Sequence, residues 1–330
     1  MDRPLVALIL AGGTGTRLYP ASRSDRPKQF QSFGRERSLL AETVDRAGFA
    51  DETYVLTRED YVDGVRDRAP GAAVLTEPEP KDTGPALAYA AHTIREQVGE
   101  CVLLCLPSDH HIEGDFEDVA RRATGVAVET GGLVTLGIEP DRPATGYGYI
   151  KPGRTEDGYQ HVDAFHEKPD RETAAEYVEA GFYWNAGMFA WTPEAFLAAT
   201  EGTPLEPLVD RLDENPADAF DAVDPVSVDY AVLERAENVS VVPADVEWDD
   251  LGSWDALERV LDHAEGNAVL GDHVSIDSEG NVLASDGHVS VVGVSDLVVA
   301  SFDDRTLVVP KGQAQRVREV VSELRASGKF

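Results

Sequence analysis

Thiols and long apolar runs are nearly absent from this sequence. Cys101 and Cys105 are the only cysteines among its 330 residues. On a strand their Cα atoms would lie about 13 Å apart, beyond the roughly 7 Å limit for a disulfide, so we expect two buried apolar strand residues. No stretch of about 18 apolar residues occurs, and the first residues lead into a strand without a signal-peptide pattern. The sequence therefore predicts a soluble, cytoplasmic protein without a membrane partner.

Positive charge is also scarce. The chain has 29 lysines and arginines against 61 aspartates and glutamates, a formal net charge of −32, and only six of the basic residues are lysines. Such a surface would repel a polyphosphate backbone, which excludes a general nucleic-acid-binding protein. The acids are spread along the chain, as in proteins of salt-loving archaea, where molar salt screens charges over about 3 Å. We expect a halophilic, haloarchaeal protein; an ordinary acidic protein is the alternative.

Short apolar runs alternate with stretches of helical spacing. Strands are expected at 5–10, 53–56, 73–75, 102–106 and 133–136, with helices at 85–97, 116–130 and 170–180. This alternation predicts an α/β fold with a mainly parallel sheet and helices on both faces. Ligands of such sheets bind at the carboxyl ends of the strands, so the loops after Leu10, Leu75 and Leu106 are the ones to inspect.

The character of the chain changes near Gly266. Before it, the aromatic stretches YGYI and FYWNAGMFAW could line a pocket for a second substrate. After it, short strand-like pieces at 289–292, 297–300 and 306–309 recur about every eight residues, and 313–326 is expected to be helical. We predict a catalytic domain at 1–265 and a small β-rich domain at 266–330.

The stretch 12–30 combines glycines with basic residues. Glycine after a first strand usually lets backbone N–H groups approach phosphate. The dinucleotide fingerprint fails because its third glycine position is Leu18, and a P-loop fails because Thr16 is followed by Arg17. Residues 17–37 include six basic residues and only two acidic ones. This local excess of positive charge favours a nucleoside triphosphate site over a tight turn with incidental arginines. The six are Arg17, Arg23, Arg26, Lys28, Arg35 and Arg37.

The segment GGTGTRLYPASRSDRPKQF resembles the signature of nucleoside-diphosphate-sugar pyrophosphorylases, and its ending PKQF resembles the mannose-1-phosphate guanylyltransferase branch. The resemblance implies a Rossmann-like nucleotidyltransferase domain in which Arg17 and Lys28 neutralise the triphosphate as charge moves onto pyrophosphate. It also implies a set of nucleotide-binding residues: Leu10, Ala11, Gly12, Gly13, Gly15, Thr16, Lys81, Asp82, Thr83, Pro107 and Ser108.

Two acidic motifs point to a metal. LCLPSDHHI places Asp109 at the end of a buried strand, and VEWDDLGSW offers Asp249 and Asp250 before a glycine turn. Two carboxylates with phosphate oxygens and waters suit Mg²⁺ or Mn²⁺, whereas zinc at His110 and His111 would need another Cys/His pair. The motifs are similar to the family's PADH-type and W-x-D-x-G-x-W motifs, which implies that Asp109 and Asp250 are the ligands.

Four further motifs, ATGYGYI, FHEKPD, YWNAGMF and SVDYAVLE, resemble the family in their order. A hexose 1-phosphate needs directional polar groups, a flat floor and a cation. Glu167 and Asn185 suit the hydroxyls, Lys168 suits the phosphate, and Asp229 could complete the site. The expected sugar-phosphate residues are Tyr147, Gly148, Glu167, Lys168, Asn185, Gly187 and Asp229.

The base-reading loop departs from the family pattern R-N-T-A-P-A, because here it reads Lys81-Asp82-Thr83-Gly84-Pro85-Ala86. Lysine keeps the charge of arginine but loses its planar fork, and aspartate could accept from guanine N1–H and N2–H but could not donate to O6. Guanine remains favoured.

The resemblance implies transfer of GMP from GTP to mannose 1-phosphate, giving GDP-mannose and pyrophosphate. One alternative is another base or sugar, such as UTP, dTTP or ATP with glucose 1-phosphate; another is a regulatory subunit that only senses GDP-mannose. The failed glycine spacing disfavours a dinucleotide-dependent oxidoreductase. The C-terminal part resembles the family's small β-helical tail without a clear hexapeptide repeat, and we expect it to serve packing or dimerisation in a homodimer.

Overall fold

The computed structural model describes residues 3–330 and forms two compact units. The first comprises the chain up to Gly12 with Thr43–Ser108 and Ile112–Trp248, and the second comprises Gly13–Glu42, Asp109–His111 and Asp249–Phe330. Neither unit is contiguous in sequence, since the glycine loop belongs with the C-terminal residues. The domain boundary near Gly266 stays a prediction. None of the helices within 3–330 has the length and apolar character needed to cross a bilayer.

A nine-stranded sheet with the order β3-β2-β1-β4-β9-β6-β10-β8-β7 forms the centre of the first unit. Its first four strands are parallel, and β10 is parallel to β6. The bounds are β1 Leu5–Leu10, β2 Glu52–Thr57, β3 Ala73–Thr76, β4 Val102–Pro107, β6 Leu133–Ile138, β7 Tyr149–Thr155, β8 Gln160–His166, β9 Tyr183–Trp191 and β10 Val239–Ala244.

All five strands predicted in this unit are present, and the α/β fold class is confirmed. The sheet is more mixed than predicted, because β9 runs antiparallel to both β4 and β6, and β8 runs antiparallel to β7 and β10. An apolar run that is buried on both faces has the same composition in either direction, so composition alone could not reveal the reversal.

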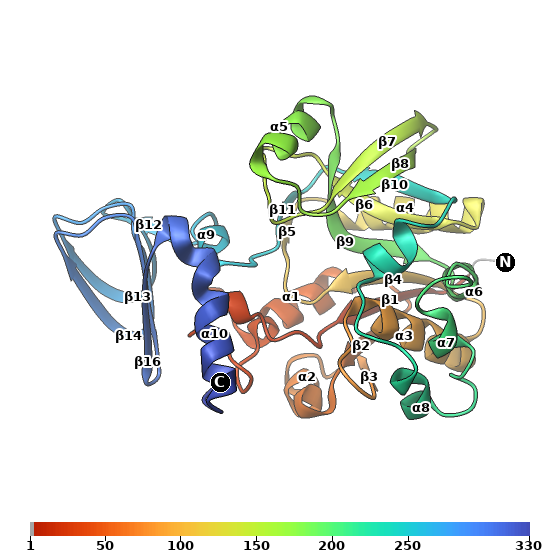
Figure 1. Ribbon diagram of the computed structural model, residues 1–330, viewed down its shortest axis with the longest axis horizontal. Helices are drawn as coiled ribbons and strands as arrows, with labels where there is room; N and C mark the ends of the chain where they lie inside the picture. Colours follow the sequence, from red (N-terminus) through yellow and green to blue (C-terminus); the bar gives the residue numbers. More distant parts are fainter. Residues whose placement is uncertain (1–2) are drawn as a thin grey trace. The chain divides into compact units, whose positions relative to one another are not determined.

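Helices cover both faces of this sheet (Figure 1). On one face, Leu103 and Cys105 of β4 pack in a buried cluster with Leu87 and Ile94 of α3. On the other face lies α4, which begins after the capping residue Asp115 and ends at a left-handed glycine. Helix bounds are α1 Leu39–Arg46, α2 Val62–Arg68, α3 Thr83–Val98, α4 Phe116–Thr130, α5 Arg171–Glu179, α6 Pro193–Ala198, α7 Glu206–Val209 and α8 Pro216–Asp221.

Both cysteines are buried free thiols, as predicted. Burial, the largest effect on both, raises the pKa of the Cys101 thiol to about 12 and raises the pKa of Cys105 as well. Neither thiol is therefore ionised near neutral pH, which is the behaviour of a small apolar core residue.

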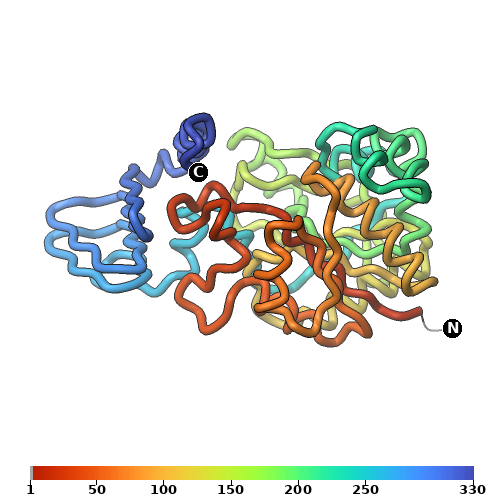
Figure 2. The backbone as a smooth tube through the Cα atoms, turned by 90° about the horizontal axis from the view of Figure 1, so that it is seen from below, coloured from red at the N-terminus to blue at the C-terminus, as the bar shows by residue number. Residues whose placement is uncertain are grey.

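The second unit contains a five-stranded sheet with the order β12-β13-β14-β15-β16, in which β13, β14 and β15 are parallel. Figure 2 shows the blue C-terminal tube winding in stacked turns. The strands of this five-stranded sheet are β12 Asp262–Ala264, β13 Asn267–Ile276, β14 Val282–Val292, β15 Leu297–Phe302 and β16 Arg305–Pro310. The helices of this part of the chain are α9 Trp254–Leu257 and α10 Val317–Ala326. A separate two-stranded sheet pairs β5 His111–Glu113 with β11 Glu247–Asp249.

Two buried asparagines hold successive turns of this coil together. The Asn281 side chain donates to Asn267 Oδ1 at 2.9 Å and to Val294 O at 3.1 Å, and its own oxygen accepts from Leu297 N–H at 3.0 Å. Both asparagines follow a Glu-Gly pair, so the tripeptide recurs at a spacing of 14 residues. This repeat of 14 residues, and not a hexapeptide, is the sequence signal of the coil.

The glycine loop is packed against the C-terminal residues of the same unit. Arg23, which is 7% exposed, binds Asp303, and Arg26 donates to Asp303 at 2.8 Å. The Trp254 indole N–H donates to Tyr19 O at 3.1 Å. Because these arginines bind protein carboxylates, the count of basic residues overstated the charge available to a phosphate.

We predict that Asn281→Ala lowers the free energy of unfolding by about 2–4 kcal/mol, because it leaves buried backbone and amide groups without partners. Urea unfolding monitored by circular dichroism measures the change. Val308→Ala on β16 is the control: Val308 is 61% exposed, so its truncation should change stability by less than about 0.5 kcal/mol. Equal losses in the two variants would contradict the structural role given to Asn281.

Candidate active site

The glycine loop folds directly onto the segment PKQF. Gly15 has a left-handed backbone with φ 71°, and a Cβ atom there would collide with the Lys28 side chain. Lys28 N–H donates to Thr14 O at 3.2 Å, and Gln29 Nε2 donates to Gly13 O at 2.9 Å. Both halves of the signature therefore form one local structure, which explains why glycine at 15 and lysine at 28 occur together.

Lys28 is the centre of a polar cluster in the second unit. Its side chain is 3% exposed, and its Nζ donates to Asp109 Oδ2 at 2.8 Å and to the Asp250 backbone oxygen at 2.5 Å. Arg17 Nη2 lies 3.9 Å from Asp250 Oδ2. The structure thus brings together all four residues predicted for catalysis and metal binding, although they come from three distant segments of the chain.

The two carboxylates of this cluster are held in their charged form. Burial by itself would raise the pKa of Asp109, but the Lys28 ammonium, with His110 and Arg17, holds the pKa below its usual value. Burial alone would also raise the pKa of Asp250, but the Lys28 ammonium and the hydrogen bond from the Gly252 N–H lower it below its usual value. Both groups are therefore anionic near neutral pH.

Ionised carboxylates suit a hard divalent cation. Within residues 3–330 no three His, Cys, Asp or Glu side chains are grouped as a complete metal site. Asp109 and Asp250 would therefore supply two oxygen ligands and leave the remainder to phosphate oxygens and waters, the arrangement that Mg²⁺ usually adopts. By donor chemistry the pair fits the cation expected from the sequence.

The neighbouring Asp249 has a different task. Its Oδ2 accepts from Arg259 Nε at 2.7 Å and its Oδ1 accepts from Leu251 N–H at 2.8 Å, so it shapes the turn.

A Cβ atom at Gly252 would collide with the Asp250 carboxylate, which explains the glycine at this position.

In the first unit, five of the predicted nucleotide residues lie at the carboxyl ends of β1 and β4: Leu10, Ala11, Gly12, Pro107 and Ser108. Ser108 N–H donates to Leu10 O at 3.1 Å, and Ala11 N–H donates to Leu56 O at 2.8 Å. Leu10 is paired with Pro107 in the register of the two strands. Neighbouring parallel strands thus end at one edge, as the sequence pattern predicted.

Side chains of the predicted base-reading loop bind the protein itself. Lys81 Nζ donates to Phe220 O at 2.9 Å and Val223 O at 3.2 Å. Asp82 caps α3 by accepting from Thr83 N–H, and Thr83 Oγ1 accepts from Val228 N–H at 3.0 Å. The departures from the family pattern therefore have structural roles, while contact with a base stays a prediction.

The predicted sugar-phosphate residues form a second polar cluster in the first unit. Asn185 Nδ2 donates to Asp229 Oδ1 at 2.6 Å, and Asn185 Oδ1 accepts from Gly187 N–H at 3.0 Å. Asn185 N–H also donates to Gly148 O at 2.9 Å. A Cβ atom at Gly148 would lie 2.8 Å from Glu167 Oε2, so glycine is needed beside that carboxylate.

Three more features complete the sugar-phosphate cluster. Lys168 is paired with Glu167. Burial raises the pKa of Asp229, against the hydrogen bond from Asn185. The Tyr147 ring packs edge-on against Trp184 and Trp248, with centroids 5.0 Å apart in each pair.

Sequence reasoning missed Glu77, which follows β3 directly. It is 7% exposed, and burial raises its pKa to about 7 against the opposing charge of Arg58. A Cβ atom at Gly12 would lie 2.7 Å from Glu77 Oε1, so the carboxyl group borders the first glycine of the signature. Its position after a strand was the available signal.

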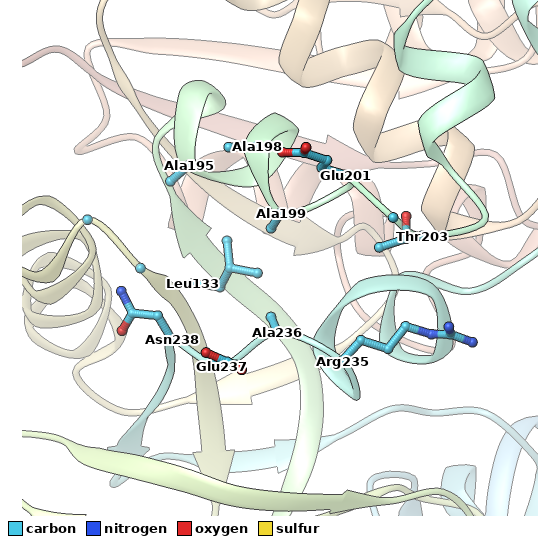
Figure 3. Close-up of a pocket in the computed structure, with 13 residues that line it drawn as sticks. Leu133, Ala195, Ala198, Ala199, Glu201, Thr203, Arg235, Ala236, Glu237 and Asn238 are labelled. Carbon is cyan, nitrogen blue, oxygen red and sulfur yellow. The ribbon is translucent and has the colours of Figure 1, made fainter.

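The first unit also has a cavity of about 640 Å³ elsewhere (Figure 3). Leu133, Glu201, Arg235 and Asn238 are among its lining residues, and none of the predicted site residues contributes. Since Leu133 begins β6 and Asn238 precedes β10, the cavity lies at the amino ends of these strands, opposite to the edge where ligands of such sheets bind.

Known proteins resemble the chain over nearly its full length. The nucleotidyl transferase family matches residues 6–266, and the MannoseP isomerase/GMP-like beta-helix domain family matches residues 271–324. Xanthan biosynthesis protein XanB of Xanthomonas campestris pv. campestris is 36% identical over 351 residues, covering 98% of this chain and 74% of that protein.

Two further relatives carry the name of an activity. The mannose-1-phosphate guanylyltransferase of Escherichia coli K12 is 36% identical over 359 residues, covering 98% of this chain and 74% of that protein. A crystal structure from Thermus thermophilus, named a mannose-1-phosphate geranyltransferase, is 38% identical with a TM-score of 0.89, covering 98% of this chain and 99% of that one. With these matches and the site geometry, the chain belongs to the nucleotidyltransferases, in the mannose-1-phosphate guanylyltransferase family.

Proposed function

We propose that this protein transfers GMP from GTP to mannose 1-phosphate, forming GDP-mannose and pyrophosphate. The observation that carries the proposal is the cluster of Lys28, Arg17, Asp109 and Asp250 beside the glycine loop. It combines two cations with two ionised carboxylates in a protein whose net charge is −32. A sensing subunit without catalysis should lack a metal-binding aspartate or the signature lysine, and this chain has Asp109, Asp250 and Lys28.

The chemistry requires no nucleophile from the protein. A phosphate oxygen of mannose 1-phosphate attacks the α-phosphorus of GTP in line, and the bond from that phosphorus to the oxygen bridging the β-phosphate breaks. The electron pair leaves with pyrophosphate, so negative charge grows on the departing group. Arg17 and Lys28 would neutralise this charge from fixed positions, which lowers the barrier because little reorganisation is needed.

Enzymes of this family generally use a divalent metal. We propose that Asp109 and Asp250 hold Mg²⁺ or Mn²⁺ here. When bound, such an ion would neutralise phosphate oxygens and help to orient them. Lys28 supports this task by keeping the Asp109 carboxylate ionised despite its burial.

For the sugar phosphate, we propose that Asn185 and Glu167 bind hydroxyls of the mannose and that Lys168 binds its phosphate. The hydrogen bonds of Asn185 to Asp229 and from Gly187 fix the orientation of its amide. A fixed amide presents defined donors and acceptors, which is what discrimination between hexose epimers requires.

We also propose that the protein is a homodimer and that its C-terminal coil contributes to the interface. Ile276 of β13 and Val292 of β14 are adjacent in register and are 51% and 65% exposed, an apolar pair on an otherwise acidic protein. Analytical ultracentrifugation of the full chain tests the assembly state.

The first functional prediction concerns substrates. Pyrophosphate release is measured in molar KCl with Mg²⁺ for GTP, ATP, UTP and dTTP, each paired with mannose 1-phosphate and with glucose 1-phosphate. GTP with mannose 1-phosphate should have the highest kcat/KM, and omission of the divalent cation should abolish turnover. A higher value for any other pair would overturn the substrate assignment.

The second functional prediction concerns the Lys28 cluster. Lys28→Ala and Asp109→Ala should each lower kcat by at least about a hundredfold, because each removes a fixed charge from the reacting phosphates or their cation. Matched controls are Lys151→Ala and Asp163→Ala, which remove the partners of an exposed ion pair 3.7 Å apart. Controls should keep kcat within about twofold, and circular dichroism verifies the fold of all four. Near-normal rates in Lys28→Ala would disprove the catalytic assignment.

A further inference from the structure

Thr135 brings a hydroxyl group into the interior of a strand that is otherwise apolar. The strand β6 has the sequence LVTLGI, and all six of its residues are buried. Thr135 is 0% exposed and has the only polar side chain among them. Valine has nearly the same shape, and burying a hydroxyl group costs free energy unless the group is hydrogen-bonded. A threonine at this position therefore points to a role for its hydroxyl group.

The one hydrogen bond that this hydroxyl forms within residues 3–330 leads to the sugar-phosphate cluster. Thr135 Oγ1 donates to Asn185 Oδ1 at 3.4 Å. Asn185 lies opposite Gly137 in the register of β6 and β9, and Thr135 precedes Gly137 by two residues on the same face of the strand. Because Gly137 has no side chain, the Asn185 amide can reach the hydroxyl along the diagonal.

A bulge in β9 holds the same amide from a second side. Thr135 is paired with Phe189, and Gly137 is paired with Asn185, so four residues of β9 span what two residues of β6 span. Gly187 lies within this bulge with φ 65°, and its N–H donates to Asn185 Oδ1 at 3.0 Å. Bulges of this kind occur beside active sites, where they re-aim a side chain.

These two contacts use the whole acceptor capacity of the Asn185 amide. A carboxamide oxygen has two lone pairs, and its NH2 group has two donors. The oxygen accepts from Thr135 and Gly187, and one of the two N–H groups donates to Asp229 Oδ1 at 2.6 Å. The N–H of Gly187 can only donate, so it fixes which end of the amide is the oxygen. One N–H donor is left for a ligand.

We propose that Thr135 is a positioning residue for the sugar phosphate: its hydroxyl occupies the second lone pair of Asn185 Oδ1, so that Asn185 presents only an N–H donor to the hexose. This inference rests on the proposed function, in which Asn185 binds a hydroxyl of mannose, and it adds the residue that fixes how this hydroxyl is held. The hexose hydroxyl accepts from Asn185 and keeps its own hydrogen for another acceptor. Turning the amide oxygen toward the sugar would leave the Thr135 and Gly187 donors without a partner.

The test removes the hydroxyl and follows the two substrates separately. For Thr135→Val, KM is measured for mannose 1-phosphate at saturating GTP and for GTP at saturating mannose 1-phosphate. A KM is independent of the fraction of folded protein, so partial misfolding cannot imitate the result. We expect KM for mannose 1-phosphate to rise about three- to tenfold, the effect of one hydrogen bond. Both kcat and KM for GTP should stay within about twofold, because only binding of the sugar phosphate is altered.

Two further variants separate the hydroxyl from the packing around it. Thr135→Ser retains the hydroxyl and should restore KM for mannose 1-phosphate to within about twofold of the unaltered protein. Thr124→Val is the matched control, because Thr124 is 6% exposed and its hydroxyl donates to Ala120 O at 3.0 Å within α4, on the other face of the sheet. It removes an equally buried hydroxyl and should leave both KM values unaltered.

A double-mutant cycle shows whether the effect passes through Asn185. Asn185→Ala should itself raise KM for mannose 1-phosphate by at least about tenfold, since it removes the donor to the hexose. Adding Thr135→Val to Asn185→Ala should change KM no further, because the amide that Thr135 positions is gone. An equal rise in both backgrounds would mean that Thr135 acts without Asn185, which overturns the inference.

Each other outcome has a definite meaning. If Thr135→Val leaves KM for mannose 1-phosphate unaltered, or raises the KM of both substrates alike, the inference is wrong. If Thr135→Ser is as impaired as Thr135→Val, packing and not the hydroxyl is responsible, which overturns it too. If Asn185→Ala leaves KM for mannose 1-phosphate unaltered, the proposed sugar contact fails and the inference with it. If the unaltered protein forms no GDP-mannose from GTP, the proposed function itself fails, and the failures are thereby distinguished.

Discussion

The buried ammonium of Lys28 is the interaction on which the second unit depends. It joins the glycine loop to Asp109 and to the backbone at Asp250, and these three points lie far apart in sequence. A lysine that is 3% exposed needs compensation for its lost hydration, and the Asp109 carboxylate and the Asp250 carbonyl provide it. The same contacts keep acidic side chains ionised where a cation and a triphosphate would meet. Structural cohesion and the chemistry proposed for the site therefore share one side chain.

The arginines of the signature divide between two tasks. Arg17 lies near the Asp250 carboxylate, whereas Arg23 and Arg26 bind carboxylates of the C-terminal coil. In a chain with 61 acidic residues, carboxylates of the protein compete with any phosphate for the few cations available. The fold resolves this competition by burying Arg23 against Asp303 and leaving Arg17 and Lys28 at the loop.

Much of the fold was predictable because buried strands and amphipathic helices leave strong local patterns. The strand at 5–10 and the helix at 116–130 were predicted with their observed bounds. The antiparallel direction of β9 could not be predicted, because the composition of an apolar run does not show which way the strand runs. The pairing of Arg23 with Asp303 depends on partners 280 residues apart, and a count of charges cannot choose among so many acids.

The residues of the candidate site were likewise predictable only in part. Motifs identified the residues around Lys28, because each lies in a distinctive stretch of sequence. Glu77 escaped notice because it is one acid among many, and only its burial separates it from its exposed neighbour Glu79. The Asn267 and Asn281 repeat was present in the sequence, but two copies at a spacing of 14 residues make a weak period.

Segments of the two units alternate along the sequence, and this order limits when the second unit can fold during biosynthesis. The loop that carries Lys28 is made early, but the turn at Asp250 and the coil that binds Arg23 are made more than 200 residues later. A nascent chain on the ribosome thus cannot assemble this unit until the segments around Asp250 and Asp303 have been made. Contacts of such long sequence separation also slow folding, because a large loop must close before they form. The Lys28 cluster consequently cannot form before the segment around Asp250 has been made, which makes the cluster a late product of folding.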